Sequence, residues 1–173
     1  VPGVPQPTGP LAGAGNVPLT TCILTSGGDN TSTPFSGVMS GPGGLTKSGS
    51  GTFTLSGANT YSDATNVAAG SLTLGANNVL ANTTAVTVAA GAVLNLAGFS
   101  DTIASLAGTG KITLNNGILT SGGDNTPPTL SGLKSVPDGV TKCGSATFPP
   151  SRAHPSAHAA PPVPAPPPPH AHP

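Results

Sequence analysis

Residues 43–80 have the sequence GGLTKSGSGTFTLSGANTYSDATNVAAGSLTLGANNVL, which contains the pattern that decides the fold. Twice in this stretch a glycine is followed by alternating apolar and polar residues, as GTFTL from Gly51 and as GSLTL from Gly70. The pattern returns as GAVLNL from Gly91 and as GKITL from Gly110, at spacings of 19, 21 and 19 residues. Alternation with period two after a glycine turn is typical of a β-strand with one buried face. The sequence therefore predicts short strands that recur at a nearly constant interval.

The alternation also predicts which side chains are buried. The apolar positions of each strand point inward, whereas Thr54, Thr73 and Thr113 point outward. GAVLNL carries one extra residue, which we interpret as a bulge or a register shift that leaves Leu94 and Leu96 inward. The predicted core of the repeat comprises Phe53, Leu55, Val67, Leu72, Leu74, Val86, Val88, Leu94, Leu96, Ile112 and Leu114.

A longer repeat contains the short one. ILTSGGDNT at 23–31 recurs letter for letter at 118–126, an offset of 95 residues. Residues 23–53 and 118–148 share 20 identities in 31 positions. Repetition on two scales is the signature of an array of similar structural units, and the offset corresponds to about five of the short units.

Two all-β architectures fit these strands: a sandwich of hairpins and a coiled parallel solenoid. One coil that buries three aliphatic side chains gains roughly 5–9 kcal/mol. Fixing the backbone of about 20 residues costs on the order of 20–40 kcal/mol, so no coil is stable alone. Stacking like coils ~4.8 Å apart pairs every strand with neighbours on both sides, which explains the short period. Asn-rich turns such as 75–78 and 115–117 fit this stacking, because Asn tolerates left-handed backbone and can form amide ladders.

Proline marks the limits of the predicted solenoid. No proline occurs from Gly43 to Thr126, whereas eleven of the 21 prolines lie in 149–173. Because proline cannot donate a ladder hydrogen bond, the proline-free stretch permits continuous sheet. We predict a β-solenoid of about seven coils over 11–148, best defined over 43–126. The Pro-rich segment 1–10 and the Pro/Ala/His-rich tail 149–173 are predicted to be disordered.

Composition excludes several classes of function. Only 6% of the residues are charged and the net charge is zero, which argues against nucleic-acid binding. No apolar run is long enough for a membrane-spanning helix. The only methionine is Met39 and no signal peptide is present, so we expect a fragment of a longer exported parent.

No catalytic, metal-binding or cofactor-binding residue is predicted. Asp29 and Asp124 occupy equivalent repeat positions, about five coils or ~24 Å apart, whereas the carboxyl groups of glycosidases lie ~5–10 Å apart. Every histidine is in the tail, so neither a Ser-His-Asp triad nor a fixed metal site is expected; these are His154, His158, His170 and His172. Outward threonines raise ice binding as a rival function, but their row is interrupted at Leu94 and Asn95.

Cys22 and Cys143 are predicted to be free thiols. They lie 121 residues apart in the sequence, which in a solenoid is about six coils or ~29 Å. A disulfide requires Cα atoms within ~7 Å.

GGLTKSGSGTFTLSGANTY (43–61), followed by TNVAAGSLTLGANNVL (65–80), resembles the passenger-associated β-strand repeat of bacterial autotransporters. The family pattern is Gly-Leu-Thr-Lys, a Gly-rich turn and Thr-Leu-Thr-Leu-Ser-Gly-x-Asn-Thr-Tyr. Phe53 replaces a smaller aliphatic residue or Leu, and Asp63 stands where Gly is common. The resemblance covers 43–126 closely and the flanking copies loosely. It implies a right-handed parallel β-helix in an exported passenger, whose parent carries a C-terminal outer-membrane barrel as its partner.

The function that the resemblance implies is a non-catalytic stalk or spacer. It would display adhesive or effector modules at the bacterial cell surface or outer membrane, or in a secreted passenger, with surface glycans or self-association as further candidate partners. Two alternatives stay open. One is a fragment of a carbohydrate-active β-helix enzyme. The other is a truncated or frameshifted pseudogene product without its own function, because Pro149-Pro150 replace the Thr-Leu expected in the repeat.

Overall fold

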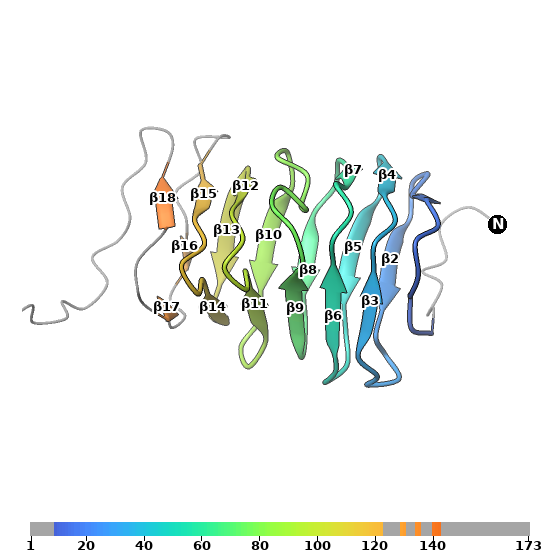
Figure 1. Ribbon diagram of the computed structural model, residues 1–173, viewed down its shortest axis with the longest axis horizontal. Coiled ribbons are helices and arrows are strands. Elements are labelled where there is room, and N and C mark those ends of the chain that lie inside the picture. Colours follow the sequence, from blue (N-terminus) through green and yellow to red (C-terminus); the bar gives the residue numbers. More distant parts are fainter. Residues whose placement is uncertain (1–8, 123–128, 131–133, 136–139, 143–173) are drawn as a thin grey trace, which may run out of the picture.

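Short strands account for all the regular secondary structure in the part of the chain that the structure describes. The computed structural model describes residues 9–122, 129–130, 134–135 and 140–142. The strands stack side by side along the long axis of the molecule in chain order, from the N-terminal blue end to the orange end (Figure 1). They form the three faces of a coil that winds around a single core.

Two faces are continuous sheets of six strands. The first face consists of β2 (Ile23–Ser26), β5 (Gly44–Lys47), β8 (Thr65–Val67), β10 (Ala85–Val88), β13 (Ser105–Gly108) and β16 (Thr129–Leu130). The second face consists of β3 (Thr33–Phe35), β6 (Thr52–Leu55), β9 (Ser71–Leu74), β11 (Val93–Asn95), β14 (Lys111–Thr113) and β17 (Lys134–Ser135).

The third face is divided into two sheets of three strands. The N-terminal part consists of β1 (Val17–Pro18), β4 (Met39–Gly41) and β7 (Thr60–Tyr61). The C-terminal part consists of β12 (Asp101–Ile103), β15 (Leu119–Ser121) and β18 (Val140–Lys142).

All of these strand pairs are parallel, and each joins residues one coil apart. On the first face Leu45 pairs with Thr65, Thr65 with Val86, and Val86 with Leu106. Antiparallel hairpins would instead pair strands that are joined by a short turn. The prediction of a parallel β-solenoid is therefore confirmed.

The structure places all eleven side chains of the predicted repeat core in the interior. Each of them is at most 1% exposed. On the second face Thr54, Thr73, Asn95 and Thr113 pair in an outward row. The extra residue of GAVLNL lies in the turn before β11, since Leu94 pairs directly with Leu72. The strand therefore contains no bulge. Relative to the paired residues, Gly91 lies one position earlier than Gly70 does before its strand.

The two identical ILTSGGDNT segments lie on different faces of the coil. The first forms β2 on the first face, and the second begins with β15 on the third face. Both have the same alternation: Ile23 and Ile118 are 43% and 48% exposed, whereas Ser26 and Ser121 are buried. The 95-residue repeat thus spans four coils and two further faces, which is close to the expected five coils but is not a whole number of them.

Several predictions from the sequence fall outside the described residues. They include the disorder of 1–8 and 149–173, the structure around Asp124, and the state of Cys143. Cys22 is a half-buried free thiol. The total of about seven coils stays a prediction.

Lys47 is a charged side chain inside the core. It lies in the inward row of the first face, between Ser26 and Val67, and its side chain is completely buried. Its Nζ donates hydrogen bonds to the carbonyl oxygens of Ser48, Gly49 and Ala69 at 2.5, 2.9 and 3.3 Å. Burial lowers the pKa of Lys47, because the charged form is poorly solvated. The lysine thus acts as an internal cap for carbonyls on two successive coils.

Replacing Lys47 tests whether its volume or its charge matters more. Lys47→Ala should lower the free energy of unfolding by about 2–5 kcal/mol, because it leaves a cavity in a packed core. Lys47→Met keeps most of the volume and removes a desolvated charge, so its effect should stay below about 1.5 kcal/mol. Urea unfolding followed by circular dichroism measures both. A methionine variant as unstable as the alanine variant would show that the three carbonyl bonds dominate.

Candidate functional site

The third face has no strand in one coil. Its sheets end at β7 and resume at β12, and residues 75–84 cross the face between them without strand structure. We call residues 75–84 the junction segment. A missing strand leaves backbone groups of the adjoining coils without their ladder partners, and buried groups of this kind must find others.

Asn59 replaces ladder bonds on the β7 side of the junction segment. Its side chain Nδ2 donates to the carbonyl oxygens of Gly57 and Val79 at 3.0 and 2.9 Å, and its Oδ1 accepts from the Met39 N–H at 2.8 Å. Its backbone N–H also donates to Val79 O at 3.0 Å. Asn59 is 4% exposed, so these bonds form in a nearly dry environment. One side chain thereby joins three successive coils.

Asp101 replaces ladder bonds on the other side. Its Oδ2 accepts from the N–H groups of Val79 and Leu80, both at 3.0 Å, and its Oδ1 accepts from the Thr102 N–H at 2.7 Å. The residue is 2% exposed. Burial raises the pKa of Asp101, and the three backbone hydrogen bonds oppose that rise. No local sequence motif indicates the role of Asp101.

A buried chain of hydroxyl groups closes the corner between the third and first faces. The hydroxyl groups of Tyr61 and Thr65 are 2.6 Å apart, and those of Thr65 and Thr84 are 3.1 Å apart. Thr84 donates to the carbonyl oxygen of Asp63 at 2.8 Å. Since each hydroxyl has one proton, Thr65 donates to Thr84 and Tyr61 donates to Thr65. Burial raises the pKa of Tyr61 to about 12; the Thr65 bond opposes this rise, and the Asp101 charge adds to it.

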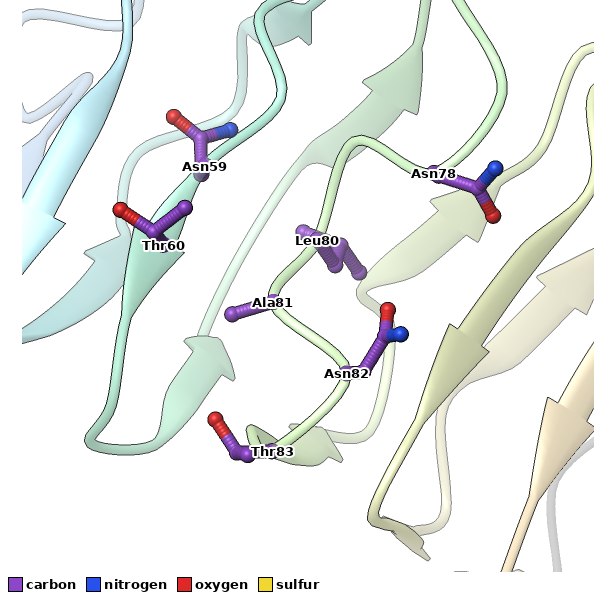
Figure 2. Close-up of a pocket in the computed structure, with 7 residues that line it drawn as sticks. All are labelled: Asn59, Thr60, Asn78, Leu80, Ala81, Asn82 and Thr83. Carbon is purple, nitrogen blue, oxygen red and sulfur yellow. The ribbon is translucent and has the colours of Figure 1, made fainter.

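A shallow cavity of about 300 Å³ is lined by Asn59, by Thr60 of β7 and by five residues of the junction segment. Its lining is mostly polar and carries no charged side chain: Asn59, Thr60, Asn78, Leu80, Ala81, Asn82 and Thr83. In Figure 2, Ala81 and Thr83 are turned toward the strand that carries Thr60, whereas Asn82 is turned toward the side of Asn78. The cavity therefore presents neutral donors and acceptors on both sides of the chain segment.

The described residues do not bring a catalytic constellation together. Among them, no three His, Cys, Asp or Glu side chains form a group that could hold a metal ion. Asp29 accepts hydrogen bonds from Thr31 within its own turn, and its repeat partner Asp124 lies outside the described residues. Nor does the described part of the chain contain a helix long and apolar enough to cross a membrane.

Comparisons with known proteins identify the repeat. Residues 45–74 match the family model described as passenger-associated-transport-repeat. The adhesin BmaC autotransporter of Brucella suis biovar 1 (strain 1330) is 38% identical to this chain over 83 residues, which are 47% of this chain and 2% of that protein. The chain thus spans a very small part of this curated relative. No solved structure matches it. The matched stretch contains Lys47, Asn59 and Tyr61, whereas Asp101 lies beyond it.

Substitution of Asp101 tests its role as a backbone acceptor. Asp101→Ala should lower the free energy of unfolding by about 2–4 kcal/mol, because it leaves the buried N–H groups of Val79 and Leu80 without an acceptor. Asp101→Asn should cost about 1 kcal/mol, since its carbonyl oxygen can still accept from both groups. Urea unfolding at neutral pH measures the difference. Equal losses in the two variants would contradict the role of the carboxylate oxygen.

The pH dependence of stability gives a second test of Asp101. Because its pKa is raised in the folded state from 3.8, the folded protein binds the proton more tightly than the unfolded chain. Its contribution to stability is therefore largest at acid pH and is lost as the pH rises through the folded-state pKa. This decline should disappear in Asp101→Asn, and its persistence there would assign it to another group.

Tyr61 is the only tyrosine in a chain without tryptophan, so phenolate absorbance reports on it alone. In the folded protein its pKa should be about 12, and in urea it should return to about 10. Stability contributed by Tyr61 is accordingly lost as the pH rises from 10 to 12. Spectrophotometric titration of the native and unfolded chain measures the shift. A native pKa near 10 would mean that the hydroxyl chain is open to water.

Proposed function

We propose that this chain is a structural stalk within the passenger of a bacterial autotransporter, and that it holds other modules of a longer parent away from the outer membrane. The repeat that the sequence predicts is confirmed by the family match at 45–74 and by similarity to an autotransporter adhesin. The observation that supports a stalk most directly is the pair of continuous six-stranded parallel sheets.

A stacked solenoid provides length and stiffness from its backbone alone. Each coil adds ~4.8 Å along the axis, and every coil hydrogen-bonds to the coils before and after it. Bending the rod would break ladder bonds on one face and compress the packed core on another. The length of the stalk therefore scales with the number of coils and does not depend on any particular surface residue.

Three of the described charged groups support a structural role rather than catalysis. Asp101 and Lys47 are buried and bound to backbone groups, and Asp29 is bound within a turn. An enzyme acting on polysaccharides would need two carboxyl groups facing one exposed cleft. We therefore prefer a non-catalytic stalk to a carbohydrate-active enzyme. In the parent, a C-terminal outer-membrane translocator is the partner that the repeat implies, and the cell surface is its expected location.

Stepwise folding outside the cell gives the stalk a second role in export. The edge of the last completed coil is a template of backbone donors and acceptors for the next one. Each added coil makes its own hydrogen bonds and buries its apolar side chains without waiting for distant parts of the chain. The pairing of β18 with β15 shows that the second copy of the long repeat also joins the ladder, which favours a folded product over a pseudogene fragment.

Insertion of whole and half coils tests the proposal. Duplication of residues 45–64 adds one coil in register, because Leu45 and Thr65 occupy the same position in successive coils. One, two and four such duplications should lengthen the molecule by about 5 Å per coil and preserve display of an N-terminal epitope when the chain is fused to an autotransporter barrel. Small-angle scattering and surface labelling of the epitope measure these effects.

Duplication of residues 45–54 alone is the matched control. It adds half a coil and shifts every later strand to the wrong face, so display and thermal stability should be lost. If the whole-coil and half-coil insertions were equally displayed, or equally lost, the proposal that a register-dependent rod carries the function would be wrong.

A further inference from the structure

The junction segment is where this solenoid departs from its own repeat. Elsewhere in the described third face a strand fills each coil, but here the strand is replaced by a loop held by Asn59 and Asp101. Local departures from an otherwise consistent pattern tend to occur at functional sites. The departure also creates the cavity of about 300 Å³ beside β7.

The backbone around the cavity is fixed in place. Asn78 N–H donates to Ser100 O, the N–H groups of Val79 and Leu80 donate to Asp101, and Thr84 N–H donates to Ala81 O. Asn78 has a left-handed backbone with φ of 53°, which Asn accepts more readily than most residues. The loop is therefore held in one shape, and a ligand would not have to bear the cost of ordering it.

The exposed side chains at the cavity have unused hydrogen-bonding capacity. Within the described residues, Thr60, Asn78, Asn82 and Thr83 are exposed and their side chains make no intramolecular hydrogen bond. Each carboxamide offers two donors and an acceptor, and each hydroxyl offers one donor and two acceptor lone pairs. Buried Asn59 adds nothing to this set, because its side chain is already bound.

The chemistry of the lining selects the class of ligand. No charged side chain lines the cavity, so neither an anion nor a cation would gain a counter-charge there. The carboxamide groups of Asn78 and Asn82 can donate and accept hydrogen bonds, as the neighbouring hydroxyl groups of a sugar also can. An extended peptide fits less well, because the adjacent strand β7 has only two residues with which it could pair.

We propose that this cavity, which we call the junction cavity, binds a neutral saccharide of at least two sugar units. Thr60 and Thr83 contact one unit on the β7 side of the junction segment, and Asn78 and Asn82 contact the next unit on the other side (Figure 2). The cavity volume lies at the lower end of the ~300–1,000 Å³ range of ligand sites, which fits a short saccharide. The site gives the rod a weak, specific surface contact in addition to its mechanical role.

Binding of defined disaccharides to the full chain tests the inference. The probes are lactose, cellobiose, maltose and N,N′-diacetylchitobiose, with glucose as the single-unit comparison and sialyllactose as the anionic one. At least one neutral disaccharide should bind with a Kd of about 1 mM, more tightly than glucose and at least as tightly as sialyllactose. Saturation-transfer difference NMR and chemical-shift titration of the asparagine side-chain amides measure the binding.

Three variants separate the junction cavity from the rest of the surface. Asn82→Ala and Thr60→Ala should each weaken binding of that disaccharide about tenfold, on the scale of one lost hydrogen-bonding group. Asn66→Ala, on the outward row of the first face, should leave it unchanged. All three should unfold at the temperature of the unmodified chain, since none of these side chains makes a hydrogen bond in the described structure.

Two results would overturn the inference. One is the absence of binding by all four neutral disaccharides at about 10 mM, a concentration at which a 1 mM site is nearly saturated. The other is binding that the Asn82 and Thr60 variants leave intact. Neither result bears on the stalk, which is tested separately by the coil insertions.

Discussion

The structure depends on one constraint: every coil must present its backbone donors and acceptors in register to the coil before and the coil after it. The first two faces meet this constraint with strands alone. On the third face a strand is missing, and the side chains of Asn59 and Asp101 supply hydrogen bonds in its place. A buried backbone group without a partner is costly, so a departure from the ladder persists only where such substitutes exist.

The repeat contains polar residues whose side chains are buried, and their hydrogen bonds to neighbouring coils explain why they occur in the core. Lys47 caps carbonyls of two coils, Asn59 joins three coils, and Tyr61 begins a chain of hydroxyl groups that ends on a backbone carbonyl. Each satisfies groups near the ends of short strands, where the ladder is interrupted by a turn. Those of their hydrogen bonds that cross between coils specify how the coils stack, because they connect residues 19 to 22 positions apart in the chain.

The proposed stalk and the proposed ligand site use different parts of the molecule. The continuous faces carry outward rows of Thr and Asn that repeat from coil to coil, which suits a soluble rod more than a selective site. The junction segment breaks this repetition and is held rigidly by groups beneath it. The proposed ligand site and the proposed stalk therefore depend on different parts of one coil, and either proposal can hold without the other.

By itself, the sequence determined the strands β6, β9, β11 and β14 of the second face, their inward and outward residues and the parallel stacking, because alternation is local and the short repeat is visible. It did not reveal that Asp101 and Lys47 are buried, since their partners are backbone groups, some of which lie about one coil away. Nor did it reveal on which face a strand lies: ILTSGGDNT forms β2 on one face and contributes β15 to another. Alternation decides which side of a strand is buried, but the face is set by the accumulated lengths of all preceding turns. Only the tertiary structure shows the combined effect of these turn lengths on the position of each strand.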